Sequence, residues 1–107
     1  MRRYGQIIRL KPEYQEEYIR LHSDVPADVN AVIKSCNISN YSIYLWNGLL
    51  FAYMEYTGED FDADMRKMGA SAVTQNWWSL TDPCQESVSP KEANQWWTNM
   101  DEVYHLS

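Results

Sequence analysis

The sequence lacks two features that proteins use to engage membranes and nucleic acids: a long apolar run and a basic cluster. No apolar stretch approaches the roughly 20 residues that span a bilayer. The segment after Met1-Arg2-Arg3 alternates polar and apolar residues, unlike a signal peptide. Nine basic residues stand against fifteen acidic ones, with no basic cluster beyond Arg2-Arg3. We therefore expect a cytoplasmic protein that binds neither nucleic acid nor membranes, because both contacts depend on clustered positive charge.

Cysteine is also scarce. Cys36 and Cys84 are the only two cysteines, and their spacing matches neither a metal site nor a redox motif. In a reducing compartment such residues are usually buried thiols. The cysteines therefore predict neither a metal site nor a redox centre.

Phenylalanine is rare, with two residues, whereas tyrosine and tryptophan are frequent, with eight and five. The rings of tyrosine and tryptophan combine an apolar body with a polar group, which suits a core and also a site for a polar, uncharged ligand. The chain of 107 residues has the size of one domain. We therefore expect residues 1–107 to form a single domain.

The first third of the chain predicts a strand followed by two helices. Residues 4–10 are rich in branched side chains and favour a strand. Pro12 suits a first helical turn, and the glutamates that follow it suit the positive end of the helix dipole, so we expect a helix over 12–22. Pro26 opens a second helix that ends near 35–37, with an apolar stripe made of Val29, Val32 and Ile33.

Asn47-Gly48 lies between two runs rich in aromatic and branched residues, 38–46 and 49–56. An Asn-Gly pair in this setting is the strongest short signal for an antiparallel hairpin. A period of two then assigns the side chains of the first strand to opposite faces of the sheet. Tyr41, Ile43 and Leu45 fall on one face, and Tyr44 and Trp46 fall on the other.

The last half of the chain predicts two more helices and a final strand. Residues 58–60 open a helix that we expect Gly69 to close as a C-terminal cap. A further helix runs from Ala70 to Leu80 and stops at Asp82-Pro83. The polar segment 85–94 is expected to be a surface loop, and Trp96-Trp97 after it to be a dimer contact. Residues 100–106 alternate in part and are expected to form the last strand.

This order of elements is typical of a ferredoxin-like α+β domain, with an antiparallel sheet and helices on one face. The opposite face of the sheet would then expose aromatic side chains to water, which is unfavourable. Two copies of the chain can solve this problem by packing their sheets together. We therefore expect a homodimer of the dimeric α/β-barrel type.

Tyr18 and His22 are four residues apart in the first predicted helix, so their side chains lie on one face, one turn apart. Histidine titrates in the physiological range, and a phenol beside it can hydrogen-bond. The pair is therefore a candidate acid/base unit, although such a pair can equally be a packed surface feature.

Several motifs together resemble the L-rhamnose mutarotase family over nearly the whole chain. The similarity lies in the order and intervals of the motifs, and no single motif carries it. The motifs are Glu16-Glu17-Tyr18 followed by His22, then Asn40-Tyr41-Ser42-Ile43-Tyr44-Leu45, Leu49-Leu50-Phe51-Ala52, Trp77-Trp78 and Glu102-Val103-Tyr104.

The resemblance implies a dimeric isomerase that interconverts the α and β anomers of L-rhamnose, or of a related 6-deoxyhexose such as L-fucose, without a metal or cofactor. It implies that His22 is the proton donor and that four aromatic residues bind the sugar: Tyr18, Tyr41, Trp77 and Trp78.

Two alternatives and one role stay open at this point. The chain could be a non-catalytic small-molecule-binding module of the same fold. It could also be a cofactor-free or haem-linked monooxygenase of that fold, with the histidine as the iron ligand in the haem-linked form. A second acid/base group is also unassigned. The candidates for it are Glu55, Tyr44, Tyr104 and His105.

Overall fold

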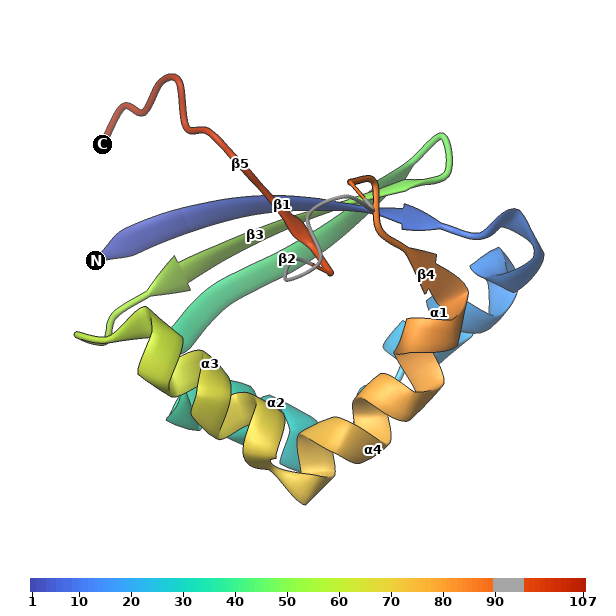
Figure 1. Ribbon diagram of the computed structural model, residues 1–107, viewed down its shortest axis with the longest axis horizontal. Coiled ribbons are helices and arrows are strands. Elements are labelled where there is room, and N and C mark those ends of the chain that lie inside the picture. The colour runs from blue at the N-terminus through green and yellow to red at the C-terminus, as the bar shows by residue number, and fades with distance from the viewer. Residues whose placement is uncertain (90–95) are drawn as a thin grey trace.

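A curled antiparallel sheet lies over a layer of helices on one of its faces (Figure 1). The computed structural model describes residues 1–89 and 96–107. Within these residues the strand order is β2-β3-β1-β4, and β5 also pairs with β1. This arrangement confirms the expected ferredoxin-like α+β fold. The strands are β1 (Arg2–Leu10), β2 (Ile38–Trp46), β3 (Leu49–Tyr56), β4 (Gln85–Glu86) and β5 (Thr98–Met100).

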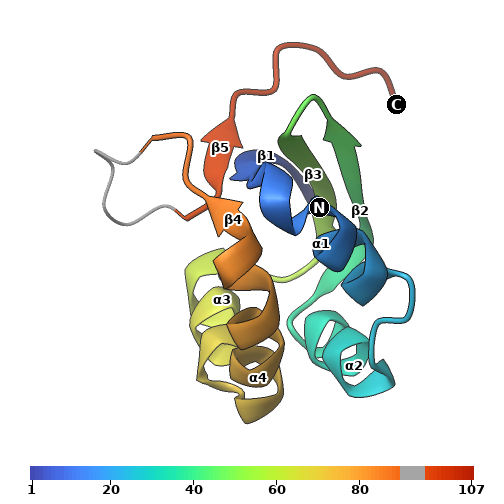
Figure 2. The same cartoon turned by 90° about the vertical axis from the view of Figure 1, so that its right-hand side faces the viewer.

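The first predicted helix consists of two pieces. A 3-10 turn over Pro12–Tyr14 precedes the α-helix because Tyr14 leaves the helical region, with φ −108° and ψ 4°. The helices α3 and α4 follow each other beneath the sheet and meet at an angle at their junction (Figure 1), and in Figure 2 the two overlap. None of the helices in the described residues is long and apolar enough to cross a membrane. The helices are α1 (Gln15–His22), α2 (Ala27–Ser35), α3 (Phe61–Ala70) and α4 (Ala72–Thr81).

The core lies between the sheet and the helices, because every second residue of β3 points toward the helices and is buried. One cluster of buried side chains surrounds Tyr18 of α1, and a second surrounds Tyr56 at the end of β3. Both cysteines are buried free thiols, as the sequence predicted. The first cluster comprises Ile8, Leu10, Tyr18, Leu50 and Cys84, and the second comprises Ile38, Met54 and Tyr56.

A β-bulge determines which face of the sheet Tyr41 occupies. Ser39 pairs with Glu55 but Ser42 pairs with Tyr53, so β2 contains one extra residue between them. Asn40 lies in this bulge with a φ of 47°, a left-handed conformation that asparagine tolerates better than most residues. The bulge turns Tyr41 to the helix-facing side, together with Ile43 and Leu45. The predicted division of β2 into two faces is therefore confirmed.

Three expectations about the second half of the chain were wrong, and the first two concern the end of α3 and the last strand. Gly69 does not cap α3, since the helix continues to Ala70 and ends at Ser71 in an extended conformation. The last strand covers Thr98–Met100, and residues 101–107 form no strand. That tail is instead held by an ion pair between Arg3 and Glu102, with 2.9 Å between nitrogen and oxygen.

The predicted surface loop over 85–94 was also wrong at its start. Gln85 is 4 % exposed and pairs with Leu10 of β1. A strand of two residues is too short to show any alternation of polar and apolar residues. Residues 90–94 of the expected loop lie outside the described residues.

A hydrogen-bond network at the end of β3 makes stability depend on pH. The hydroxyl of Tyr56 and the amide of Asn37 donate to the Asp64 carboxylate and hold its pKa below the ordinary value. A lowered folded-state pKa contributes stability that is complete above the ordinary aspartate value, about 3.9, and is lost as pH falls through the folded-state pKa. We expect Asp64→Asn to remove this contribution.

The free energies of unfolding of the wild type and Asp64→Asn should therefore differ most at neutral pH. The difference should shrink as pH falls below about 4. Urea unfolding at several pH values measures it, with the exposed Asp62→Asn as the matched control. A difference that stays constant with pH would contradict this assignment.

Candidate active site

The helix α1 positions Tyr18 and His22 beside each other. Tyr18 is 4 % exposed and anchors the helix in the core, whereas His22 is half-buried at the last turn of the helix. The ring centroids of the two side chains are 4.2 Å apart, with 32° between the planes. The anchored phenol therefore limits the positions that the imidazole can adopt.

The imidazole of His22 is held in one tautomer. Its Nδ1 lies 2.9 Å from the backbone carbonyl oxygen of Tyr18. A carbonyl oxygen only accepts hydrogen bonds, so Nδ1 carries a hydrogen and donates it. In the neutral ring Nε2 is then the unprotonated nitrogen. This nitrogen accepts a proton when the ring is neutral and gives one up when the ring is cationic.

Trp77 of α4 closes the other side of His22. Its ring centroid lies 5.3 Å from that of the imidazole, in an edge-to-face arrangement with 69° between the planes. Trp78 follows on the same helix, so its side chain points about 100° away. The Trp78 ring lies against α3 at Gly69. If Gly69 were replaced by alanine, the new β-carbon would lie 3.7 Å from the Trp78 ring. The structure thus brings Trp77, and not Trp78, to His22.

Tyr41 approaches the same place from the sheet. The residue is 39 % exposed, yet the surrounding protein raises the pKa of its phenol to about 12. The Tyr41 phenol is thus partly accessible but poorly solvated, as is typical of a side chain in a concave surface. The pKa of Tyr18 is raised as well, mainly by burial and next by the Tyr41 phenol. The two hydroxyl groups therefore lie close enough to interact electrostatically.

Gln85 and Trp96 belong to the same group of residues, although the sequence did not single them out as a unit. The Gln85 amide nitrogen donates to the Tyr18 hydroxyl at 3.2 Å. The Trp96 indole nitrogen donates to the Gln85 amide oxygen at 2.9 Å. Trp97 packs against the buried cluster around Tyr18. In this protomer both tryptophans thus contact their own chain.

The four candidates for a second acid/base group lie elsewhere. Glu55 is on the outer face of the sheet, where hydrogen bonds from Asn40 and then Tyr53 lower its pKa. Tyr44 is on the same outer face and is 66 % exposed, and the remaining two candidates are in the exposed tail. The structure places none of the four beside His22. The remaining two are Tyr104 and His105.

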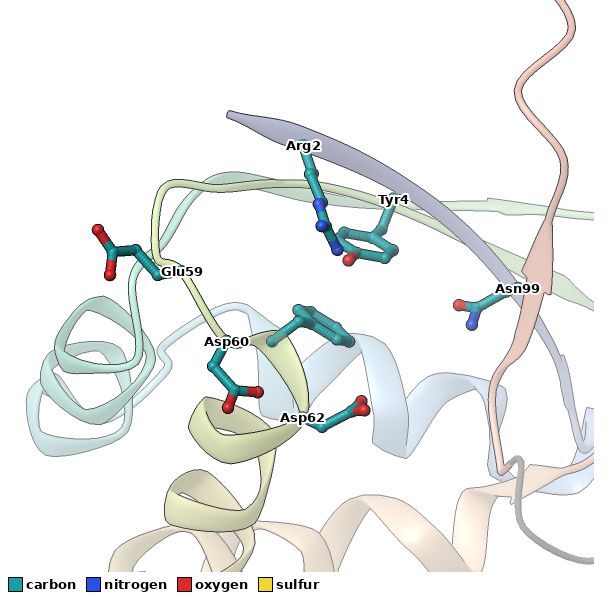
Figure 3. Close-up of a pocket in the computed structure, with 7 residues that line it drawn as sticks. Arg2, Tyr4, Glu59, Asp60, Asp62 and Asn99 are labelled. Carbon is teal, nitrogen blue, oxygen red and sulfur yellow. The ribbon is translucent and has the colours of Figure 1, made fainter.

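Two pockets of the described part of the chain can be compared with this group of residues. A pocket of about 440 Å³ lies between α2 and α4, with Trp77 in its wall. A second pocket of about 330 Å³ lies where β1, β5 and the start of α3 meet (Figure 3). Its wall contains three acidic side chains around Tyr4, whose ring stacks on Phe61 at 4.2 Å. That second pocket contains none of the candidate site residues, and the first contains Trp77 alone among them.

A grouping of three or more side chains able to hold a metal ion does not occur within residues 1–89 and 96–107. The candidate site is instead an arrangement of one imidazole, two phenols, one indole ring and a buried amide. Such groups can transfer protons and form hydrogen bonds with hydroxyl groups. An aromatic ring face can also pack against the C–H surface of a sugar.

Comparison with known proteins gives consistent results. The family model described as L-rhamnose mutarotase matches residues 3–106. A protein named L-rhamnose mutarotase from Ligilactobacillus salivarius is 33 % identical, over 97 % of this chain and 96 % of the relative. A protein of the same name from Shigella flexneri is 32 % identical, over 94 % of this chain and 93 % of the relative.

Solved structures confirm the fold. The crystal structure of an L-rhamnose mutarotase from Formosa agariphila has a TM-score of 0.77 at 16 % identity. The superposition covers 100 % of this chain and 100 % of that mutarotase. Tetracenomycin F2 cyclase from Streptomyces glaucescens, a type II polyketide cyclase, has a TM-score of 0.72 at 10 % identity, over 100 % of this chain and 98 % of the cyclase. At such identities the likeness concerns the fold alone.

Proposed function

The chain belongs to the L-rhamnose mutarotase family, and on that premise we propose that it is an isomerase that interconverts the α and β anomers of L-rhamnose. The observation that carries the proposal is the imidazole of His22, which is held in one tautomer between a phenol and an indole ring. This arrangement leaves Nε2 available to exchange a proton with a bound sugar.

Ring opening requires that the ring oxygen gains one proton and that the anomeric hydroxyl loses one. In ring opening, the cationic imidazole gives its Nε2 proton to the ring oxygen as the bond between that oxygen and the anomeric carbon breaks. The anomeric hydroxyl loses its proton to solvent and becomes the aldehyde carbonyl. In closure the neutral Nε2 takes the proton back from the hydroxyl that was the ring oxygen, as this oxygen attacks either face of the carbonyl, and the carbonyl oxygen takes a proton from solvent to become the anomeric hydroxyl. One residue therefore serves as acid and then as base.

The aromatic groups supply sugar recognition in this proposal. The Trp77 ring offers a surface for the C–H patch and methyl group of a 6-deoxy sugar. Tyr18 and Tyr41 offer hydroxyl groups to the hydroxyls of the sugar. Trp78 is also proposed to bind the sugar, from the family resemblance, but its ring lies toward α3, so we propose that its contribution is much smaller than that of Trp77. L-Fucose and related 6-deoxyhexoses stay within the proposed substrate range.

Exchange between sugar anomers tests this function directly. Saturation-transfer NMR on L-rhamnose, with catalytic amounts of protein, measures the rate of anomer exchange above the rate in buffer. A panel that includes L-fucose and D-glucose ranks the substrates. A non-catalytic binding module would bind a sugar without accelerating its exchange, and that result would reject the isomerase. A preparation that is coloured by bound haem would instead support the monooxygenase alternative.

We further propose that the protein is a homodimer whose two sheets pack together through their outer faces. Tyr44 and Trp46 on this face are 66 % and 69 % exposed, and the pairing register continues the apolar row to Phe51 and Ile7. Exposed aromatic surface of this kind is typical of an interface. Cytoplasmic location and the lack of nucleic-acid partners remain predictions from the composition.

Trp46→Glu is expected to weaken the dimer at least tenfold, because it buries a charge without a partner in the apolar interface. Light scattering coupled to size-exclusion chromatography measures the mass at several concentrations. The matched control is Ile19→Glu, which changes an exposed apolar residue of α1, away from the sheet face. A wild-type protein that stays monomeric at high concentration would reject the homodimer.

A further inference from the structure

Gln85 connects the Tyr18 phenol to the Trp96 indole through two hydrogen bonds. The Gln85 side chain is almost completely buried, with 4 % of the residue exposed, and both ends of its amide have a partner. A buried amide with both ends paired has one fixed orientation. That orientation decides which atoms donate and which accept along the whole connection.

The direction of the two hydrogen bonds follows from Trp96. An indole N–H can only donate, so the atom that faces it must be the amide oxygen of Gln85. The NH₂ group of Gln85 then faces Tyr18, and the phenol oxygen accepts from it at 3.2 Å. The hydrogen of the Tyr18 hydroxyl is thus left over and needs a different acceptor. No hydrogen bond among the described residues uses it.

The Tyr18 phenol is itself part of the candidate site, so an oxygen of a bound sugar can supply the acceptor that this hydrogen needs. The Tyr18 ring packs on His22, and the Tyr41 phenol is near enough to contribute, after burial, to the raised pKa of Tyr18. We propose that Gln85 is a positioning residue that makes the Tyr18 hydroxyl a hydrogen-bond donor to one oxygen of the bound sugar. This inference rests on the proposed function, since it concerns how the same site holds L-rhamnose.

The proposal explains why an amide suits this position better than a carboxylate. An ionised carboxylate at residue 85 would accept hydrogen bonds from both Trp96 and Tyr18. It would therefore turn the Tyr18 hydrogen away from the sugar and present the oxygen lone pairs instead. A protonated carboxyl group has one carbonyl and one O–H, so it would restore the pattern of the amide. Burial raises the pKa of a carboxyl group, so lowering the pH moves residue 85 from the carboxylate toward the protonated form.

Gln85→Glu tests the proposal through the pH dependence of sugar binding. We expect the KM for L-rhamnose to exceed that of the wild type about tenfold at pH 8, the usual cost of one lost hydrogen bond to a ligand. The ratio of the two KM values should return toward one as pH falls to 5. In a Tyr18→Phe background the same substitution should produce no pH-dependent ratio. A purely structural role for Gln85 would not require the Tyr18 hydroxyl for this effect.

The matched control is Glu86→Gln, which changes the charge of the exposed neighbour in the opposite direction. Its KM ratio should stay constant with pH. An active wild type with a flat ratio for Gln85→Glu, or with the same ratio in the Tyr18→Phe background, would overturn the inference alone. If the wild type accelerates no anomer exchange, the proposed function fails. The dissociation constant of L-rhamnose from calorimetry, over the same pH range and variants, then decides the inference, and a sugar that does not bind overturns it.

Discussion

His22→Ala is expected to remove the catalysed part of anomer exchange, a loss of about a hundredfold to ten-thousandfold in kcat/KM, which is the usual contribution of one acid/base group. Exchange should continue at the rate of the sugar in buffer, because mutarotation also proceeds in water. The half-buried ring at the last turn of α1 contributes little to the core, so the variant should fold normally. Saturation-transfer NMR measures the rate, and circular dichroism checks the fold.

His105→Ala is the matched control, because it removes the other histidine of the chain from the exposed tail. It should leave the exchange rate unchanged. Added imidazole should restore part of the rate to His22→Ala, after subtraction of the effect of imidazole on the sugar alone. An unchanged exchange rate in His22→Ala would mean that another residue is the proton donor. If both variants lost the catalysed exchange, the loss would be caused by damage to the dimer or to the fold and not by removal of the proton donor.

The hairpin and its turn could be predicted from sequence because the signals are local. Asn47-Gly48 has φ values of 52° and 72°, which the pair adopts more easily than other residues do. The division of β2 into two faces was correct over Tyr41, Ile43 and Leu45, yet the bulge at Asn40 was not visible. Counting alternate residues from Ile38 would have placed Tyr41 on the outer face. One extra residue with a left-handed conformation therefore brings a candidate site residue to the helices.

The connection through Gln85 could not be predicted, because it depends on contacts between distant segments. Gln85 is separated from Tyr18 by 67 positions, and its strand of two residues has no periodic pattern. A glutamine in a polar stretch is usually exposed, and only the pairing of β4 with β1 buries this one. The sequence singled out Trp96 as an aromatic residue, but it gave no sign that Gln85 accepts a hydrogen bond from it. Side-chain connections between such segments require the tertiary structure.

The family resemblance directed attention to His22, Tyr18 and Trp77 together, and the helical spacing supported only the first two. Residues that are adjacent in a helix, such as Trp77 and Trp78, cannot both face one point. The sequence does not say which of the two faces His22. That choice follows from how α4 packs against α3, where the Trp78 ring lies over Gly69. The two tryptophans therefore provide a test with an internal control.

Trp77→Leu is expected to lower kcat/KM for L-rhamnose by roughly thirtyfold or more, because truncating an aromatic anchor in a binding site usually costs about 2 kcal/mol. Trp78→Leu should lower kcat/KM by less than about threefold and should instead reduce the free energy of unfolding by about 1 kcal/mol through lost contact with α3. Both variants keep an apolar side chain, so they differ chiefly in the direction of the ring that is lost. A greater loss of sugar turnover in Trp78→Leu would mean that its indole reaches the sugar, and the site would then extend toward α3.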